Sequence, residues 1–224
     1  MEEIGKIVQY KFNLFGLNIV VNVETLIMTY LIMAFLMVIS LTLYKKISLI
    51  PSTLQSIFEP LIEGFDTLVK DTLETDDRKY YALITALFMF LFLCDSIGVI
   101  PGCEEPTKDL NTPLGLGIMG FIIAHYSGIK VKGFKKYFKE YLEPFFIMAP
   151  LNVIGELAKI VSISFRLFGN MMGGSIIIAV VSHLIYNIAL PPFLYAFFGL
   201  FDGTIQAFVF TMLTLVYISL QVKE

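Results

Sequence analysis

The stretch that decides the fold is residues 144–186, PFFIMAPLNVIGELAKIVSISFRLFGNMMGGSIIIAVVSHLIY. It holds over forty residues with few helix breakers, and its only charged side chains are Glu156, Lys159 and Arg166. A helix of about 20 residues crosses the roughly 30 Å hydrocarbon layer of a bilayer. Because this stretch is about twice that long, we expect one membrane helix that lies strongly tilted.

A second long apolar run occupies residues 193–220, after a turn that we expect near residues 186–192. It should carry the chain back across the membrane, so that two long oblique helices form a hairpin. Gln206 falls as far beyond position 186 as Arg166 falls before it. A turn there would bring these two side chains opposite each other.

Three shorter apolar segments precede this pair, at residues 25–44, 80–100 and 110–130. Each is close to the length that one crossing requires. The sequence therefore predicts an all-α integral membrane protein with about five membrane helices, the last two long and strongly tilted as a hairpin. We expect residues 1–224 to form a single membrane domain.

Basic residues set the expected orientation, because lysine and arginine near the ends of spans mark the cytoplasmic side. Lys45 and Lys46 follow the first span, and five lysines at positions 130, 132, 135, 136 and 139 follow the third. The loop between the second and third spans carries more acidic than basic residues, which fits the outer face. We expect the N-terminus outside and the C-terminus in the cytoplasm.

Residues 52–75 show apolar side chains at steps of three and four, as one face of a helix requires. We expect an amphipathic helix at the cytoplasmic surface, bent by Pro60 because proline removes a backbone donor. The polar face is acidic, whereas helices that bind anionic lipid usually carry lysine and arginine there. This favours a protein partner for that face, which carries Glu63, Asp66, Asp71 and Glu74.

The composition excludes several function classes. Hydrophobic residues make up 57% of the chain and charged residues 16%, against about 25% charged in soluble domains, so the lipid bilayer is the expected solvent. A net charge of −3 without a long basic tract predicts no nucleic-acid partner. Cys94 and Cys103 have no metal-binding or redox spacing, and we expect no metal site and no cofactor. The first apolar run is too long for a cleaved signal peptide.

Arg166 is the strongest functional candidate, because a charge in the middle of a membrane costs at least about 2.5 kcal/mol and is by default functional. Arginine keeps its proton, so it acts as a fixed positive charge. Opposite a carboxylate of another subunit, it would favour release of a cation bound there. The alternative is a structural salt bridge, for which Asp202 and Glu156 are the nearest carboxylates in sequence.

Polar and small residues surround this arginine at helical spacing. Asn170 lies one turn beyond Arg166, and Lys159 lies about two turns before it, so the three share one face. Such a stripe in an apolar helix indicates an ion path. Gly169 and Gly173 form a small-xxx-small pair that allows another helix to approach closely.

Four motifs together resemble subunit a of F-type ATP synthases, over roughly residues 50–220. They are RLFGNM at 166–171, QAF at 206–208, PTKDLN at 106–111 and LTLVYIS at 213–219. The resemblance implies a non-catalytic channel subunit in the inner (cell) membrane of a bacterium. Its partners would be the ring of c subunits, the b subunits of the peripheral stalk and, indirectly, the catalytic head that handles ATP.

The same resemblance implies roles for individual residues. Arg166 would face the essential carboxylate of the c ring, between two offset half-channels, with Gln206 close by. Asp109 and Asn111 would belong to the half-channel open to the outer side.

Independently of the resemblance, Lys159 in the polar stripe and Glu156 are further ion-translocation candidates on the long helix. Glu156, like Asp95 in the second span, either lines an aqueous cavity or approaches the membrane interface.

Two positions depart from many proton-driven relatives, which carry glutamate nine residues after the arginine and histidine seven before the glutamine. Here these positions are Ser175 and Gly199. A proton relay would then need Asp202 or His183, the latter of which could equally be a satisfied buried polar residue. The other possibility is a transient path for hydrated sodium, and the two departures favour this one slightly.

Two other function classes compete with this one. A self-contained secondary transporter usually shows paired repeats and short broken helices, and neither is visible in the sequence. A membrane hydrolase would need a nucleophile motif such as Gly-x-Ser-x-Gly, which does not occur. A phosphate-cradling Gly-x-x-x-x-Gly-Lys motif is also missing, so we expect no nucleotide site on this chain and no enzyme activity of its own.

Overall fold

The computed structural model describes residues 9–14, 17–45, 53–74, 78–100, 103–142, 149–184 and 190–222. Within these residues, five helical segments are long and apolar enough to cross a membrane. They are Val23–Lys45, Lys79–Val99, Asn111–Lys132, Ala149–Leu184 and Leu190–Val222. The predicted fold class, an all-α integral membrane protein with about five membrane helices, is confirmed.

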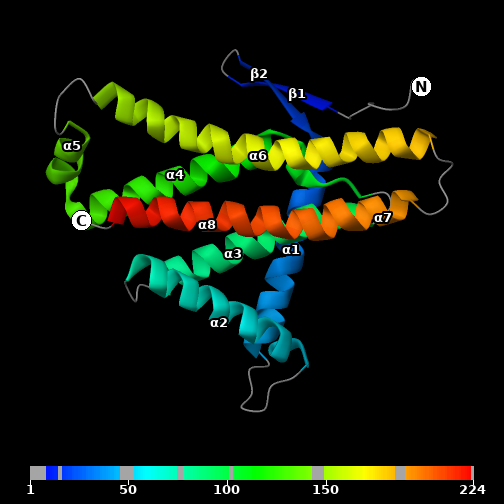
Figure 1. Cartoon of the computed structure of the whole chain (residues 1–224), viewed down its shortest axis with the longest axis horizontal. Helices are drawn as coiled ribbons and strands as arrows, with labels where there is room; N and C mark the ends of the chain where they lie inside the picture. The colour runs from blue at the N-terminus through cyan, green and yellow to red at the C-terminus, as the bar shows by residue number, and fades with distance from the viewer. Residues whose placement is uncertain are drawn as a thin grey trace.

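The two long C-terminal segments dominate the shape. Helix α6 (Ala149–Leu184) has 36 residues and, at about 1.5 Å per residue, is roughly 54 Å long. It lies side by side with the return segment, and α1 (Val23–Lys45) crosses the direction of both at a steep angle (Figure 1). The residues of the predicted turn up to position 189, and the expected start of the long helix at position 144, lie outside the described residues.

The return segment is not one regular helix. It consists of α7 (Leu190–Ala196), a π-helical turn η4 (Phe197–Asp202) and α8 (Gly203–Val222). The backbone N–H of Gly203 donates to the carbonyls of Leu200 and Phe198, the second of which is the wide hydrogen bond of a π turn. A single helix over residues 193–220 was the expectation, and hydrophobic spacing alone does not reveal such a turn.

The core lies where α8 packs against α3 (Arg78–Ser96) and α4 (Asn111–Lys132). Helix α2 (Thr53–Leu73) adds its apolar face to this core, and it continues through Pro60. The core therefore joins α2, α3, α4 and α6 to α8. Its fully buried side chains are Val69, Ile84, Leu91, Leu215 and Ile218.

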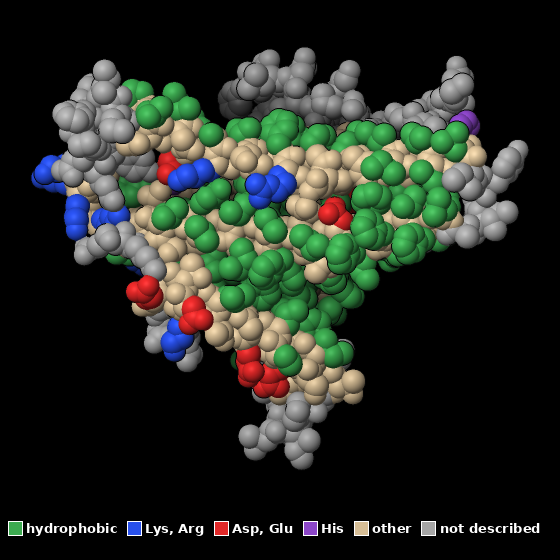
Figure 2. Space-filling view, viewed as in Figure 1, with side chains coloured by type: hydrophobic (Ala, Val, Ile, Leu, Met, Phe, Trp, Pro, Cys, Tyr) green, Lys and Arg blue, Asp and Glu red, His purple; other side chains and the backbone are tan. Residues whose placement is uncertain are grey.

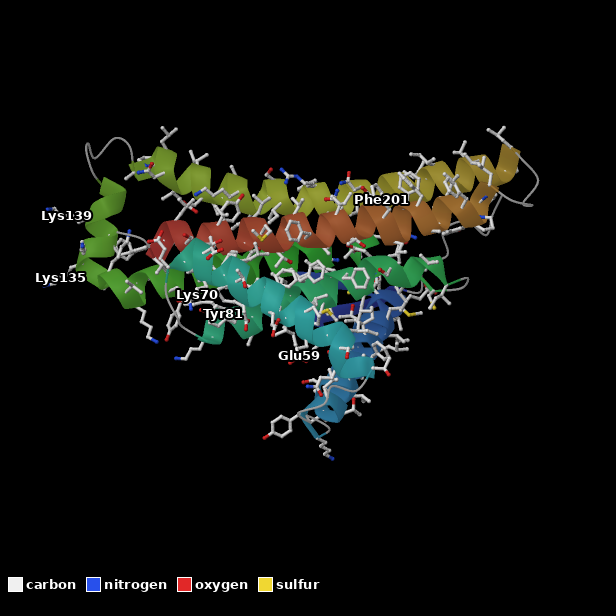
Figure 3. All side chains as sticks on the ribbon, turned by 60° about the horizontal axis from the view of Figure 1, so that its bottom comes forward. Glu59, Lys70, Tyr81, Lys135, Lys139 and Phe201 are labelled. Carbon is white, nitrogen blue, oxygen red and sulfur yellow. The ribbon has the colours of Figure 1, made fainter. Side chains whose placement is uncertain are left out.

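Two elements were not expected from the sequence. An antiparallel hairpin of β1 (Gln9–Leu14) and β2 (Leu17–Asn22) precedes α1, with Gln9 opposite Asn22. A short helix α5 (Phe134–Leu142) follows α4 and carries Lys135 and Lys139 on its outer side (Figure 3). Between α4 and α5, Gly133 adopts φ +82°, a conformation that favours glycine, and its N–H caps the carbonyl of Ile129 at 2.9 Å.

The outer surface of the helices is apolar, as lipid or partner helices require. Hydrophobic side chains cover much of the face in Figure 2, with only scattered charged groups over the long helices. On α1, Ile32 is the buried residue, whereas Tyr30, Met37 and Val38 are each more than half exposed. This helix therefore offers most of its surface to the membrane or to another subunit.

Close contact between α4 and its neighbours depends on small residues. A Cβ atom at Gly128 would lie 2.8 Å from Cε2 of Tyr137 and 3.0 Å from the backbone oxygen of Gln221. By contrast, a Cβ atom at Gly115 on the same helix would meet open space. Gly128 thus marks a position where α4 and α8 touch almost backbone to backbone.

We predict that Gly128→Leu destabilises the fold by about 1–3 kcal/mol, because overpacking forces the two helices apart. Gly115→Leu is the matched control, and it should be neutral or slightly stabilising because leucine favours helix more than glycine does. Thermal unfolding of the purified protein in detergent measures both changes. Equal stability of the two variants would contradict the close α4–α8 packing.

Candidate functional site

Arg166 lies near the middle of α6 on the face that points away from the rest of the chain. Its side chain is exposed, whereas Ser164 and Leu167 beside it are buried. Phe165 is also exposed, at 51%, so the arginine stands in an apolar outer surface. Among the described residues, Arg166 makes no hydrogen bond or ion pair. The alternative of a salt bridge therefore finds no support among the described residues, where Glu156 pairs with Lys159 instead.

Asn170 and Gln206, expected near this arginine, are both half-buried, on α6 and α8 respectively. Helices α6 and α8 pack against each other, as the predicted hairpin requires. Within the described part of the chain, neither side chain is hydrogen-bonded to Arg166. A direct role beside the guanidinium stays a prediction for both.

Lys159 differs from Arg166, although the sequence places them on one face. Its Nζ atom lies 2.7 Å from Oε1 of Glu156 and 5.5 Å from the ring centroid of Tyr217. Gln221 donates from Nε2 to the same Glu156 oxygen at 3.3 Å and accepts a hydrogen bond from the Tyr137 hydroxyl at 2.8 Å. Glu156 thus neutralises the positive charge of Lys159 locally. Of the predicted polar stripe, Lys159 is therefore the member that is engaged in an ion pair within the chain.

Cavities flank the Glu156 network at the end of α6 that is expected to face the cytoplasm. One has a volume of about 330 Å³ and is lined by Asn152, Gly155, Glu156, Lys159 and Gln221, together with Leu151 and Leu220. Another, of about 410 Å³, reaches Glu156 from the side of α4 and α5, where His125 and Tyr137 lie. Glu156 is therefore the carboxylate that both cavities share.

Asp109 joins three parts of the fold. Its Oδ1 accepts hydrogen bonds from Asn111, at 3.1 Å from the backbone N and 2.9 Å from Nδ2. Its Oδ2 accepts a hydrogen bond from Asn22 Nδ2 and lies 3.5 Å from the hydroxyl of Thr25. Both oxygens are occupied, so this carboxylate holds the end of the β-hairpin and the start of α1 against α4.

Ser175, His183 and Asp202 are not hydrogen-bonded to one another within the described residues. Ser175 donates its hydroxyl to the backbone oxygen of Met171 at 2.9 Å, a common use of serine within helices. His183 is exposed in the last turn of α6. Asp202 is half-buried at the end of η4, a turn that packs against α3.

From the sequence, Asp95 interrupts the second span and could line an aqueous cavity or approach the membrane interface, whereas Glu105 received no role. Asp95 is 0% exposed, and its Oδ1 accepts a hydrogen bond from the Thr107 hydroxyl at 2.6 Å. Glu105 is 8% exposed and lies 3.4 Å from Lys108 Nζ. Burial raises the pKa of the Glu105 carboxyl, and Lys108 works in the opposite direction. A charged residue inside an apolar run was the available signal.

Comparison with known proteins gives a family. The family model described as ATP synthase A chain matches residues 24–219. A protein named ATP synthase subunit a from Sulfurihydrogenibium sp. (strain YO3AOP1) is 40% identical over 180 residues, which cover 78% of this chain and 85% of that protein. Its counterpart from Moorella thermoacetica is 34% identical over 196 residues, covering 88% and 89%. The protein of this name from Campylobacter jejuni (strain RM1221) is 35% identical over 189 residues, covering 81% and 82%.

We predict that Asp109→Asn loosens the β-hairpin from α4 by about 1–3 kcal/mol, because one acceptor oxygen becomes a donor that faces other donors. Limited proteolysis before α1 should then become faster. Glu59→Gln, the same chemical change on the exposed side of α2 (Figure 3), should leave the rate unaltered. A hairpin equally protected in both variants would show that Asp109 does not hold it.

Proposed function

This chain belongs to the ATP synthase A chain family, and we propose that Arg166 is the fixed positive charge past which its ions move. The family makes the chain a multi-pass membrane component of an F-type ATP synthase and not the catalytic subunit. The resemblance drawn from RLFGNM and QAF is thereby confirmed. The residue roles below are the proposal.

The observation that carries the proposal is the exposed and unpaired state of Arg166 within the described chain. A guanidinium always carries its charge, and leaving it in hydrocarbon without a counter-ion is costly. The surrounding exposed side chains, such as Phe165 and Met172, are apolar and offer no counter-ion. The compensating carboxylate must then come from a partner, for which the ring of c subunits is the proposed source.

The glycines near Arg166 support a partner on this face. A Cβ atom at Gly169 or Gly173 would meet nothing within 4 Å, although Gly174 packs closely against Phe198. The first two glycines therefore do not serve packing within the described chain. Small residues on an outer face let a neighbouring helix approach closely. We propose that this helix belongs to the c ring, with the peripheral stalk b subunits held elsewhere on the membrane face.

Polar cavities at opposite ends of the molecule support two offset half-channels. A cavity of about 600 Å³ has Glu24, Glu104 and Lys108 in its wall, on the side expected to face outward. The cavity of about 330 Å³ beside Glu156 and Lys159 lies at the side expected to face the cytoplasm. Ions entering at one end would reach the ring carboxylate, travel with the ring and leave at the other. In this scheme the flow of protons or sodium ions drives rotation and ATP synthesis.

Placement in a membrane follows from the same scheme. We propose the inner (cell) membrane of a bacterium, with the N-terminus outside and the lysine-rich α5 in the cytoplasm. In that orientation Glu156 and Lys159 serve the cytoplasmic half-channel. Asp109 and Asn111 lie at the outer side, where Asp109 also has the structural task described above.

We predict that Arg166→Ala abolishes ATP-driven ion transport by the assembled complex, while the detached catalytic head keeps its ATP hydrolysis. Removing one member of a charge pair in an apolar site costs about 3–5 kcal/mol, so coupled transport should fall more than about a hundredfold. Arg166→Lys keeps the charge but loses the planar fork, and it should also transport poorly.

Reconstituted vesicles that accumulate ions on addition of ATP provide the measurement. Met172→Leu, a change on the same exposed surface of α6, is the control and should transport normally. Normal transport by either Arg166 variant would remove the proposed role of this residue.

A further inference from the structure

The place where α3 meets the return segment is unusually tight and contains a buried carboxyl group. A Cβ atom at Gly203 would lie 2.7 Å from the Cβ of Asp95, and one at Gly199 would lie 2.7 Å from Cγ2 of Val99. Only glycine permits this approach, so η4 and the start of α8 close directly over Asp95. The Asp95 side chain is therefore enclosed between α3 and the turn that ends in Asp202.

One oxygen of this carboxyl group lacks a partner. Oδ1 accepts the hydrogen bond from Thr107, whereas Oδ2 is buried and has no hydrogen-bond partner among the described residues. An ionised carboxylate in such a place is expensive unless it is paired. Buried polar groups are normally satisfied, so an orphan carboxyl oxygen in a closed site suggests that it exchanges a proton.

Other ionisable side chains surround the Asp95 carboxyl group. Asp95 interacts electrostatically with Glu105 and with Asp202, and Cys94 is its titratable neighbour on α3. Glu105 is paired with Lys108, and it lies so close over Gly98 that a Cβ there would overlap its carboxylate.

The route to solvent begins in the cavity of about 600 Å³, whose wall includes both Gly98 and Lys108. Carboxyl groups thus succeed one another from this cavity through Glu105 and Asp95 to Asp202. Asp202 lies four residues before Gln206, about one helical turn away, on the return segment that packs against α6.

We propose that Asp95 is a proton-relay residue of the outer ion path, between the Glu105–Lys108 pair and Asp202. This inference rests on the proposed function, and it names groups in one half-channel. A proton arriving from the cavity binds Oδ2 of the Asp95 carboxylate, and release to Asp202 restores the anion. Thr107 holds the carboxyl group in place by its hydrogen bond to Oδ1.

The relay also bears on the coupling ion. A carboxyl group that is 0% exposed has no room for a hydrated cation beside it. This enclosure suits a proton better than sodium, and it opposes the preference for sodium that Ser175 and Gly199 suggested from the sequence.

Asp95→Asn is the first test, because its amide oxygen can still accept the Thr107 hydrogen bond while the side chain no longer binds a proton at neutral pH. ATP-driven acidification of vesicles that contain the purified complex, in sodium-free buffer, is the measurement. We expect acidification without sodium from the unmodified complex and at least a tenfold loss in the variant. Glu59→Gln on exposed α2 is the control and should acidify normally.

Thr107→Val provides a second test that does not remove the carboxyl group. Valine has nearly the shape of threonine but cannot donate to Asp95, so the anion loses stabilisation and the pH profile of proton pumping should shift upward. Thr107→Ser restores the hydroxyl and should restore the profile. An unchanged profile in Thr107→Val would overturn the relay, even if Asp95→Asn failed to assemble.

Comparison with Arg166→Ala separates this inference from the proposed function. If Asp95→Asn pumps normally and Arg166→Ala does not, the relay is wrong and the function stands. If both variants pump normally, both the relay and the proposed function are wrong. Pumping that requires sodium in the unmodified complex would also overturn the relay.

Discussion

The constraint on which this structure depends is that hydrocarbon does not solvate charge, so each ionised side chain needs a partner within reach. Lys159 has Glu156, Lys108 has Glu105, and Asp109 has the amides of Asn22 and Asn111. These pairs lie towards the two ends of the membrane helices, where water can also help. Arg166, in the middle of α6, has no such partner among the described residues. Unlike the paired charges, it therefore requires a counter-ion from beyond these residues.

Small residues make this arrangement of charges possible. Gly117 lies against Ser164, Gly120 against Thr214 and Gly203 against Asp95, so hydroxyl and carboxyl groups sit between helices that would otherwise be held apart. In lipid, helices gain little from hydrophobic burial, and close van der Waals contact with shared polar groups replaces it. Packing and ion handling thus use the same contacts, and a change that separates α3 from α8 would alter both.

Much of this could be predicted from the sequence because it is encoded locally. Span lengths, the tilt required of residues 144–186 and the cost of Arg166 follow from counting residues against a bilayer. The link between Asp95 and Thr107 could not be predicted, since it depends on how α3 returns against the loop before α4. Helical spacing allows the ion pair of Glu156 and Lys159, three residues apart, but it gave no sign that Gln221 of α8 would donate to the same carboxylate. Helical periodicity reports which residues share a face and is silent about what that face meets.

The π-helical turn at Phe197–Asp202 changes the angular phase of the return segment. One additional residue in a turn rotates everything beyond it by about 100° relative to a continuous α-helix. Helices α7 and α8 therefore present unrelated stripes of side chains, although the chain between them is unbroken. The gain or loss of one residue in this turn would rotate α7 relative to α8. The sequence of α7 can therefore change among relatives without altering the register of α8 against α4.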